Sequence, residues 1–420
     1  KAPLQPLLDL RNSQGTKALA VDVRRVYDAY SGGYVDPEAI RAFLMEAYAT
    51  WPAASSPQDR VTPLSVVLVG DGTYDPRNFE QRERTPTLIS TYMIEGVRRW
   101  LGEVACDNCY GQFGDANTLF IMDVWVGRFP VKSTEEVQLV VSKIVSYETA
   151  TDLKATWRST ALYLADNHLK PFLGSAQCAT GCVDGGGDFA EFPDNAWVLN
   201  PNRTVPGLTP RVYFDPFPGT PNPPVFNEWW RVGLREDAQK RALWGLQDGP
   251  ALVVYNGHAN IFNMGELEKT GAARAFLLGL TDAFSLYRTN QLYVQLSMTC
   301  MTASFATPAN SGTTIDEGFF LAPRGGAVAV WGSSGQSVAA GHELLQDGFF
   351  AKLFAKPGVA VRLGDLLEAG YMEFALAGPS NSDVLYNFLL LGDPLTKFNY
   401  RIDPRAANYV SPIYIPAVTK

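Results

Sequence analysis

The chain has 420 residues, of which 46% are hydrophobic and 19% charged, an ordinary globular composition with enough apolar surface for a large core. The net charge of −8 and the lack of a basic stripe argue against a general nucleic-acid surface, because phosphate binding needs clustered Lys and Arg. No apolar run reaches the length of a membrane span, so we expect no transmembrane segment and two or three domains or subdomains.

The first part of the chain alternates predicted strands with predicted helices. Apolar β-type runs predict strands at residues 18–23, 64–69 and 119–126. One helix is predicted to begin after Asp36, with Pro at its first position. Another is predicted to begin at Ser133, where Glu136 completes a capping box. These elements predict a first α/β subdomain, without catalytic residues, over residues 1–150.

A Gly-rich turn at residues 70–76 follows the second of these strands and carries Asp71 and Asp75. Two acids in such a turn could bind a structural calcium ion. We favour the alternative that they bond their own backbone, as Asp does in many turns. The sequence indicates no other cofactor, and we expect none to be required.

A second subdomain is predicted over residues 151–403, with a tail at 404–420. Residues 168–224 include a glycine run and eight prolines between Pro201 and Pro224, which predicts a surface insertion. Helices are predicted at residues 227–247, 315–321, 341–354, 364–376 and 383–391, and strands at 160–165, 251–255, 292–296, 326–331 and 395–402. The alternation predicts an α/β fold: a three-layer α/β/α sandwich with mostly parallel sheets.

Two of these predicted strands end in loops that carry reactive side chains. The run at 251–255 leads to His258, and the run at 292–296 leads to Cys300. The segment between them is long enough for a helical crossover, so parallel pairing would bring both loops to one edge of the sheet, where ligands bind. A Cys beside a His can act as a nucleophile with its acid and base partner. Taken singly, each is more often a buried apolar residue or a turn residue.

The five cysteines sort into two close pairs, Cys106 with Cys109 and Cys178 with Cys182, and Cys300 alone. Four paired cysteines and one left over fit two disulfides and one free thiol in an exported protein. The same spacings also fit a four-Cys zinc site. We favour disulfides, because no redox or zinc-ribbon context surrounds the pairs.

Motifs along nearly the whole chain resemble those of the gingipain-like cysteine peptidases, and they occur in the order of that family. They are VVLVGDGTYDPRN, DVWVGRFPVKSTEEVQLVVSKIVSYE, VVYNGHA, VQLSMTCMTASF, GGAVAVWGSSG, GHELLQDGFFAKLF and LLLGDP. The resemblance implies a caspase-like fold of two α/β subdomains, with the catalytic His and Cys on the second. It also implies an exported enzyme that is made as a precursor.

The resemblance assigns roles residue by residue. It implies that Cys300 is the nucleophile, that His258 is the general acid and base, and that the backbone amides of Ala259 and Cys300 form the oxyanion hole. Ala259 stands where the family usually has Gly. Alanine keeps the backbone amide but allows a smaller range of backbone conformations than glycine. Asp166 is the candidate for orienting the imidazole, and Asp188 for selecting Arg or Lys in the substrate. His342, at the start of a predicted helix, is interpreted as structural.

The function predicted from these residues is hydrolysis of peptide bonds by a cysteine endopeptidase at the cell surface or outside the cell, on protein or peptide substrates. One alternative is a transpeptidase that passes the same acyl group to an amine. The other is a catalytically weak surface or scaffold protein. Family members begin with a strand that the chain lacks before residues 4–15. We therefore expect an excised piece with a companion fragment from the same precursor.

Overall fold

The computed structural model describes residues 1–51, 64–79, 81, 87–96, 102–114, 122–165, 211–214, 231–232, 235–270, 273–307, 312–337, 341–356, 358–378 and 382–401. The predicted tail at 404–420 and most of the predicted insertion lie outside these residues. Among the helices that the structure describes, none combines the length and apolar character that a membrane span requires.

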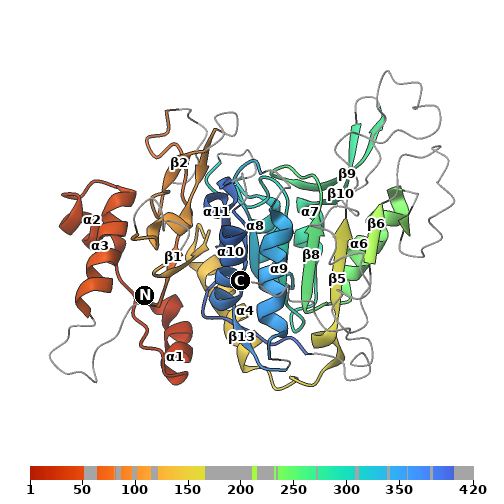
Figure 1. The fold of residues 1–420 in the computed structure, drawn as a ribbon, viewed down its shortest axis with the longest axis horizontal. Helices are drawn as coiled ribbons and strands as arrows, with labels where there is room; N and C mark the ends of the chain where they lie inside the picture. Colours follow the sequence, from red (N-terminus) through yellow and green to blue (C-terminus); the bar gives the residue numbers. More distant parts are fainter. Residues whose placement is uncertain are drawn as a thin grey trace, which may run out of the picture.

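One central sheet of nine described strands organises the molecule (Figure 1). Its order is β1 (Ser65–Val69), β4 (Trp125–Phe129), β14 (Phe388–Leu391), β12 (Ala327–Ser333), β11 (Tyr293–Met298), β8 (Leu252–Asn256), β5 (Ala161–Ala165), β6 (Arg211–Phe214) and β7 (Arg231–Val232). Every neighbouring pair is parallel except β12 with β14. Strands β5, β8, β11, β12 and β14 are buried along their whole length, as a sheet covered on both faces requires.

Helices cover both faces of this sheet. On one face the Trp331 ring of β12 packs against Phe349 of α9 (His342–Phe354) and Tyr371 of α10 (Leu363–Ala377). The next residue, Gly332, faces Asp316 of α8 (Ile315–Leu321) on the opposite side, because neighbouring strand residues point to opposite faces. The α/β/α sandwich with a mostly parallel sheet, predicted from the sequence, is confirmed.

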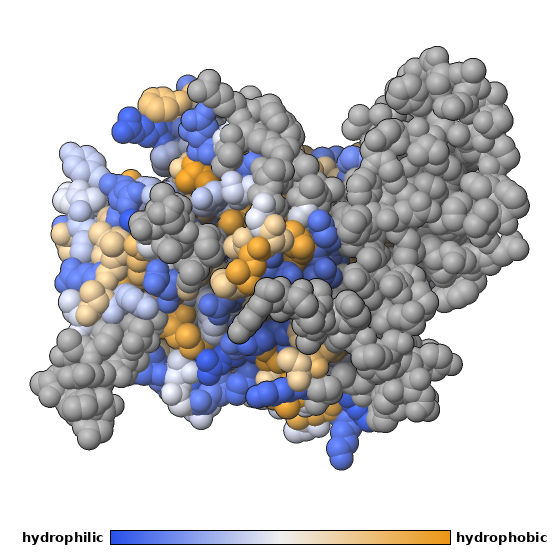
Figure 2. All heavy atoms as spheres, in the orientation of Figure 1, coloured by the Kyte–Doolittle hydropathy of each residue, from blue (hydrophilic) through white to orange (hydrophobic). Residues whose placement is uncertain are grey.

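The remaining helices extend these two layers. They are α1 (Gln5–Ser13), α2 (Val23–Tyr30), α3 (Pro37–Thr50), α4 (Thr134–Thr149), α6 (Arg235–Gln247), α7 (Leu280–Ser285) and α11 (Asp383–Asn387). Helices α2 and α3 pack on β1 and form a small second core. Apolar side chains on the face seen in Figure 2 lie in small groups separated by polar ones.

Several predicted elements differ from the structure. Within the described residues, the predicted helix at 227–247 begins only at Arg235, after strand β7, and the predicted strand at 395–402 is limited to β15 (Lys397–Phe398). Residues 18–22 form no strand, because the Asp22 side chain accepts from the Arg24 amide and starts α2. The predicted helix at 383–391 ends at Asn387, and its last four apolar residues form β14 instead. Between β8 and β11 the chain forms the hairpin of β9 (Asn263–Thr270) and β10 (Ala273–Gly279) before the short α7, rather than one crossover helix.

A short 3-10 helix, η5 (Asp107–Tyr110), joins distant parts of the sheet. The buried Arg128 guanidinium on β4 donates to both Asp107 carboxylate oxygens, at 2.7 and 2.8 Å. The Asn108 side chain donates to the carbonyls of Leu385 and Phe388, at 3.1 and 2.9 Å. Strand β4 also pairs with β14, so the sheet continues across the boundary predicted near residue 150. The division into two subdomains stays a prediction.

We predict that Arg128→Met destabilises the fold by about 3–5 kcal/mol, because it leaves the buried Asp107 carboxylate without its cation. The midpoint of urea unfolding measures this loss. Arg24→Met is the matched control, because Arg24 pairs with Asp22 through a side chain that is 83% exposed. Equal midpoints for the two variants would contradict a structural role for the buried pair.

Candidate active site

Strands β8 and β11 bring the two candidate catalytic loops to one edge of the sheet. Their parallel register pairs Ser297 with Tyr255 and Met298 with Asn256. His258 and Cys300 therefore each lie two residues beyond the same matched pair. The Thr299 hydroxyl donates to the Gly257 carbonyl at 2.6 Å, which joins the residue before Cys300 to the residue before His258. The parallel pairing of these two runs is thus present as predicted.

Cys300 is the free cysteine of the described residues, and its side chain is partly buried. Its Sγ donates to the Ser337 carbonyl at 3.1 Å and accepts from the Ser337 amide at 3.4 Å. Burial raises the pKa of the thiol, and the Ser337 amide opposes that rise. A hydrogen bond to sulfur from this amide favours the thiolate, which is the reactive form.

The loop after Cys300 is strained and anchored. Met301 has a φ of 58°, in the left-handed region that residues other than Gly seldom adopt, at a cost of about 1–2 kcal/mol. Its amide donates to the Gly335 carbonyl at 2.8 Å, and the Ala303 amide donates to the Ser333 carbonyl at 2.9 Å. The loop that follows β12 therefore holds the loop that carries the thiol.

The loop after β8 folds back on β9. The His258 carbonyl accepts from the Gly265 amide at 2.9 Å, and Ala259 forms an isolated antiparallel bridge with Met264. Within the described residues, neither the amide of Ala259 nor that of Cys300 has a hydrogen-bond acceptor. Two amides left open at neighbouring strand ends are suited to binding an oxyanion.

A buried polar network lies on the α8 side of β11. The Asp316 carboxylate accepts from Gln295 at 3.0 Å and from Ser297 at 2.9 Å. Gly332 leaves room for it, since a Cβ there would lie 2.4 Å from Asp316 Oδ2. Burial raises the pKa of Asp316 to about 7. Sequence reasoning missed this network, although polar residues at alternate positions of an apolar strand were a signal for it.

Comparison with protein families shows the family of the chain. A family model matches residues 1–399 and describes peptidase family C25. The chain belongs to peptidase family C25. The gingipain-like family and the enzyme class predicted from the motifs, a cysteine endopeptidase, are confirmed.

Solved structures share the fold of this family C25 chain. The Arg-specific cysteine proteinase gingipain R (RGPB) matches with 18% identity and a TM-score of 0.64, over 95% of this chain and 76% of that chain. A complex of Porphyromonas gingivalis RgpB pro- and mature domains matches with 18% identity and a TM-score of 0.64, over 95% and 77%. A structure described as a protease matches at 15% identity, with a TM-score of 0.62, over 96% and 76%. A sequence search of curated proteins finds no match.

Several predicted site residues of the family C25 chain lie outside the described residues: Asp166, Asp188, Cys178 and Cys182. Cys106 and Cys109 form a disulfide, so neither sulfur serves as a zinc ligand. Asp71 pairs with Lys132 at 3.2 Å, and Asp75 accepts from the Phe79 amide at 2.9 Å. No cluster of three metal-ligating side chains occurs among the described residues, and a structural calcium ion stays a prediction.

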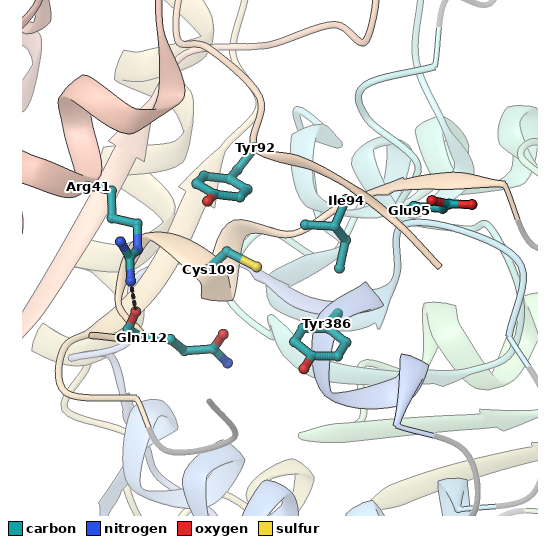
Figure 3. Close-up of a pocket in the computed structure, with 7 residues that line it drawn as sticks. All are labelled: Arg41, Tyr92, Ile94, Glu95, Cys109, Gln112 and Tyr386. Carbon is teal, nitrogen blue, oxygen red and sulfur yellow. Dashed lines mark hydrogen bonds between the residues drawn. The ribbon is translucent and has the colours of Figure 1, made fainter. Parts of the chain in front are cut away.

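A pocket of about 400 Å³ has none of the candidate catalytic residues in its lining (Figure 3). The Arg41 side chain lies at one side of it and donates to the Gln112 carbonyl at 2.8 Å, and Cys109 of the disulfide faces it. Its lining consists of Arg41, Tyr92, Ile94, Glu95, Cys109, Gln112 and Tyr386. Since none of the predicted catalytic or substrate-binding residues lines it, the pocket carries no argument about peptide hydrolysis.

We predict that the ionisation of Asp316 makes the folded chain less stable as pH rises. Its pKa moves from an ordinary 3.8 to about 7 in the folded chain, so the stability it contributes is complete below pH 3.8 and is lost as pH passes through about 7. Between about pH 5 and pH 8 the unfolding free energy of the native chain should fall by about 2–3 kcal/mol relative to Asp316→Asn. Urea unfolding at several pH values measures this difference. If the unfolding free energies of the native chain and Asp316→Asn change with pH in the same way, Asp316 is already ionised in the folded chain and the prediction is wrong.

Proposed function

We propose that this family C25 chain is an exported endopeptidase, with Cys300 as nucleophile and His258 as general acid and base. The shared strand edge carries the proposal, because β8 and β11 end in register and Thr299 bonds to Gly257 at 2.6 Å. Loops that are joined in this way keep two reacting side chains in a fixed relative position. Such positioning lowers the activation barrier by several kcal/mol.

The proposed reaction has two steps that share one covalent intermediate. His258 takes the thiol proton, and the Cys300 sulfur bonds to the substrate carbonyl carbon. His258 then gives the proton to the amine as the C–N bond breaks, which leaves a thioester. Water attacks the thioester and His258 accepts its proton; the C–S bond then breaks, which releases the carboxylic acid, and His258 returns the proton to the sulfur.

The amides of Ala259 and Cys300 are proposed to bind the carbonyl oxygen as it gains negative charge. Both donors lie open within the described residues, and both are held at strand ends before the charge develops. The Ala259 methyl group does not remove its amide, so the departure from the usual Gly is compatible with this role. Asp166 is proposed to orient His258; β5 ends beside β8, with Ala165 paired to Asn256.

The proposed substrate preference is Arg or Lys before the cleaved bond, selected by Asp188. Gingipain R is described as Arg-specific, and its fold is the one this chain shares. A carboxylate in the substrate pocket would pair with the cationic side chain. A cleavage profile over a peptide library tests this: Asp188→Asn should lose the preference for cationic side chains, and a native profile without such a preference would refute it.

A companion fragment from the same precursor is proposed as a partner. The RgpB neighbour forms a complex of pro- and mature domains. Here β1 is the last strand of the sheet and pairs only with β4 among the described strands, so its other edge can accept a further strand. Native mass spectrometry of the protein purified from its source should find two associated fragments, and a single chain without a companion would refute the pairing.

Transpeptidation is the second candidate, because the same thioester can pass to an amine instead of water. It rests on the same Cys300 and His258, so product masses with an added amine separate the two reactions. A catalytically weak scaffold is the third candidate, and failure of every thiol probe under reducing conditions would favour it.

We predict that Cys300→Ala and His258→Ala each lower kcat/KM on unstructured peptides by at least about a thousandfold, because each removes one half of the reacting pair. Ser142→Ala is the control, since this exposed serine of α4 bonds only its own helix, to the Leu139 carbonyl at 2.8 Å. Activity that survives Cys300→Ala in a chain with native circular dichroism would remove the cysteine peptidase assignment.

A further inference from the structure

The first turn of α9 lies beside both candidate catalytic loops. His342 opens the helix, its side chain is buried, and its ring meets the Phe388 ring edge-on at 5.0 Å. Gly341 precedes it with a φ of 110°, and a Cβ there would lie 2.2 Å from the Phe374 ring. Only Gly tolerates both the left-handed backbone and this contact, so the start of the helix is held in place.

The His342 ring hydrogen-bonds to Ser337: its Nε2 lies 2.9 Å from the Ser337 hydroxyl. Burial lowers the pKa of His342 to about 4, so the ring is neutral near pH 7, and the nearby Met298 carbonyl opposes that lowering. A neutral imidazole has one N–H and one acceptor nitrogen, so Nε2 and the hydroxyl can form this bond with either as the donor.

Ser337 connects this ring to the thiol. Its backbone amide and carbonyl both contact Cys300 Sγ, at 3.4 and 3.1 Å, while its hydroxyl is held by His342. A serine that is held by its side chain presents its backbone in a constant position. The amide that favours the Cys300 thiolate thus depends on a histidine that does not itself contact the sulfur.

The same helical turn also reaches the strand of His258. Gln346 donates to the Asn256 side chain at 3.1 Å and to the His342 carbonyl at 3.3 Å. Asn256 ends β8, so α9 bonds to the end of the strand that precedes His258, and its His342 ring lies near the carbonyl of Met298, which ends β11. The sequence interpretation of His342 as merely structural did not foresee this connection.

We propose that His342 and Ser337 are positioning residues for the Cys300 thiol: the His342 ring holds the Ser337 hydroxyl, and the Ser337 backbone holds the sulfur in the orientation for attack. This inference deepens the proposed function and rests on it. The pair performs no proton transfer to substrate. It limits the motion of the nucleophile and supplies the amide that favours the thiolate.

The experiment compares Ser337→Ala, which removes the hydroxyl and keeps the backbone, with His342→Phe, which keeps a ring against Phe388. Both should lower kcat by about 10- to 100-fold with KM changed less than about twofold, since a small misplacement of a reacting group costs that much. Both variants should slow alkylation of Cys300 by iodoacetamide at neutral pH by at least about fivefold. The Ser337 amide is then no longer held beside the sulfur, so a smaller fraction of Cys300 is the reactive thiolate. Ser337→Thr keeps a hydroxyl and should recover most of the loss.

Ser142→Ala is the matched serine control and should leave kcat and the alkylation rate at native values. If Ser337→Ala reacts and turns over like the native chain, the positioning role is refuted even when His342→Phe fails to fold. If iodoacetamide does not label Cys300 in the native chain, or activity survives Cys300→Ala, the proposed function itself fails. The two failures are therefore distinguishable.

Discussion

The parallel register of β8 and β11 is the constraint on which the rest of the site depends. It places Asn256 beside Met298, so that both strands end at the same position along the same edge of the sheet. The hydrogen bond from Thr299 to Gly257 then keeps the two exit loops together. A slip of one residue in this register would turn the side chains of one strand to the opposite face and separate the loops.

The layers around this strand pair reinforce that register from both faces. On one side Gln346 of α9 donates to Asn256, and on the other the buried Asp316 accepts from Gln295 and Ser297 of β11. Buried polar groups without partners cost free energy, so these bonds favour one arrangement of the strands over its alternatives. The reactive loops thus sit on a rigid base, with strain confined to Met301.

The sequence predicted the layered fold and the strands of the site, because mostly apolar runs such as those before His258 and Cys300 identify buried strands from local pattern alone. It did not predict that Ser337 and His342 meet, since that contact depends on the close approach of Gly341 to Phe374, which is far along the chain. Residues 18–22 were wrongly predicted for a local reason: their apolar run resembles a strand, but the Asp22 cap begins a helix.

The pairing of Cys300 with His258 is tested most directly by a crystal structure of the chain after reaction with a peptidyl chloromethyl ketone. We expect a thioether on Cys300 Sγ, the ketone oxygen within hydrogen-bond distance of the amides of Ala259 and Cys300, and the His258 ring facing the sulfur. A label on another side chain, or an imidazole of His258 directed away from a modified Cys300, would contradict it.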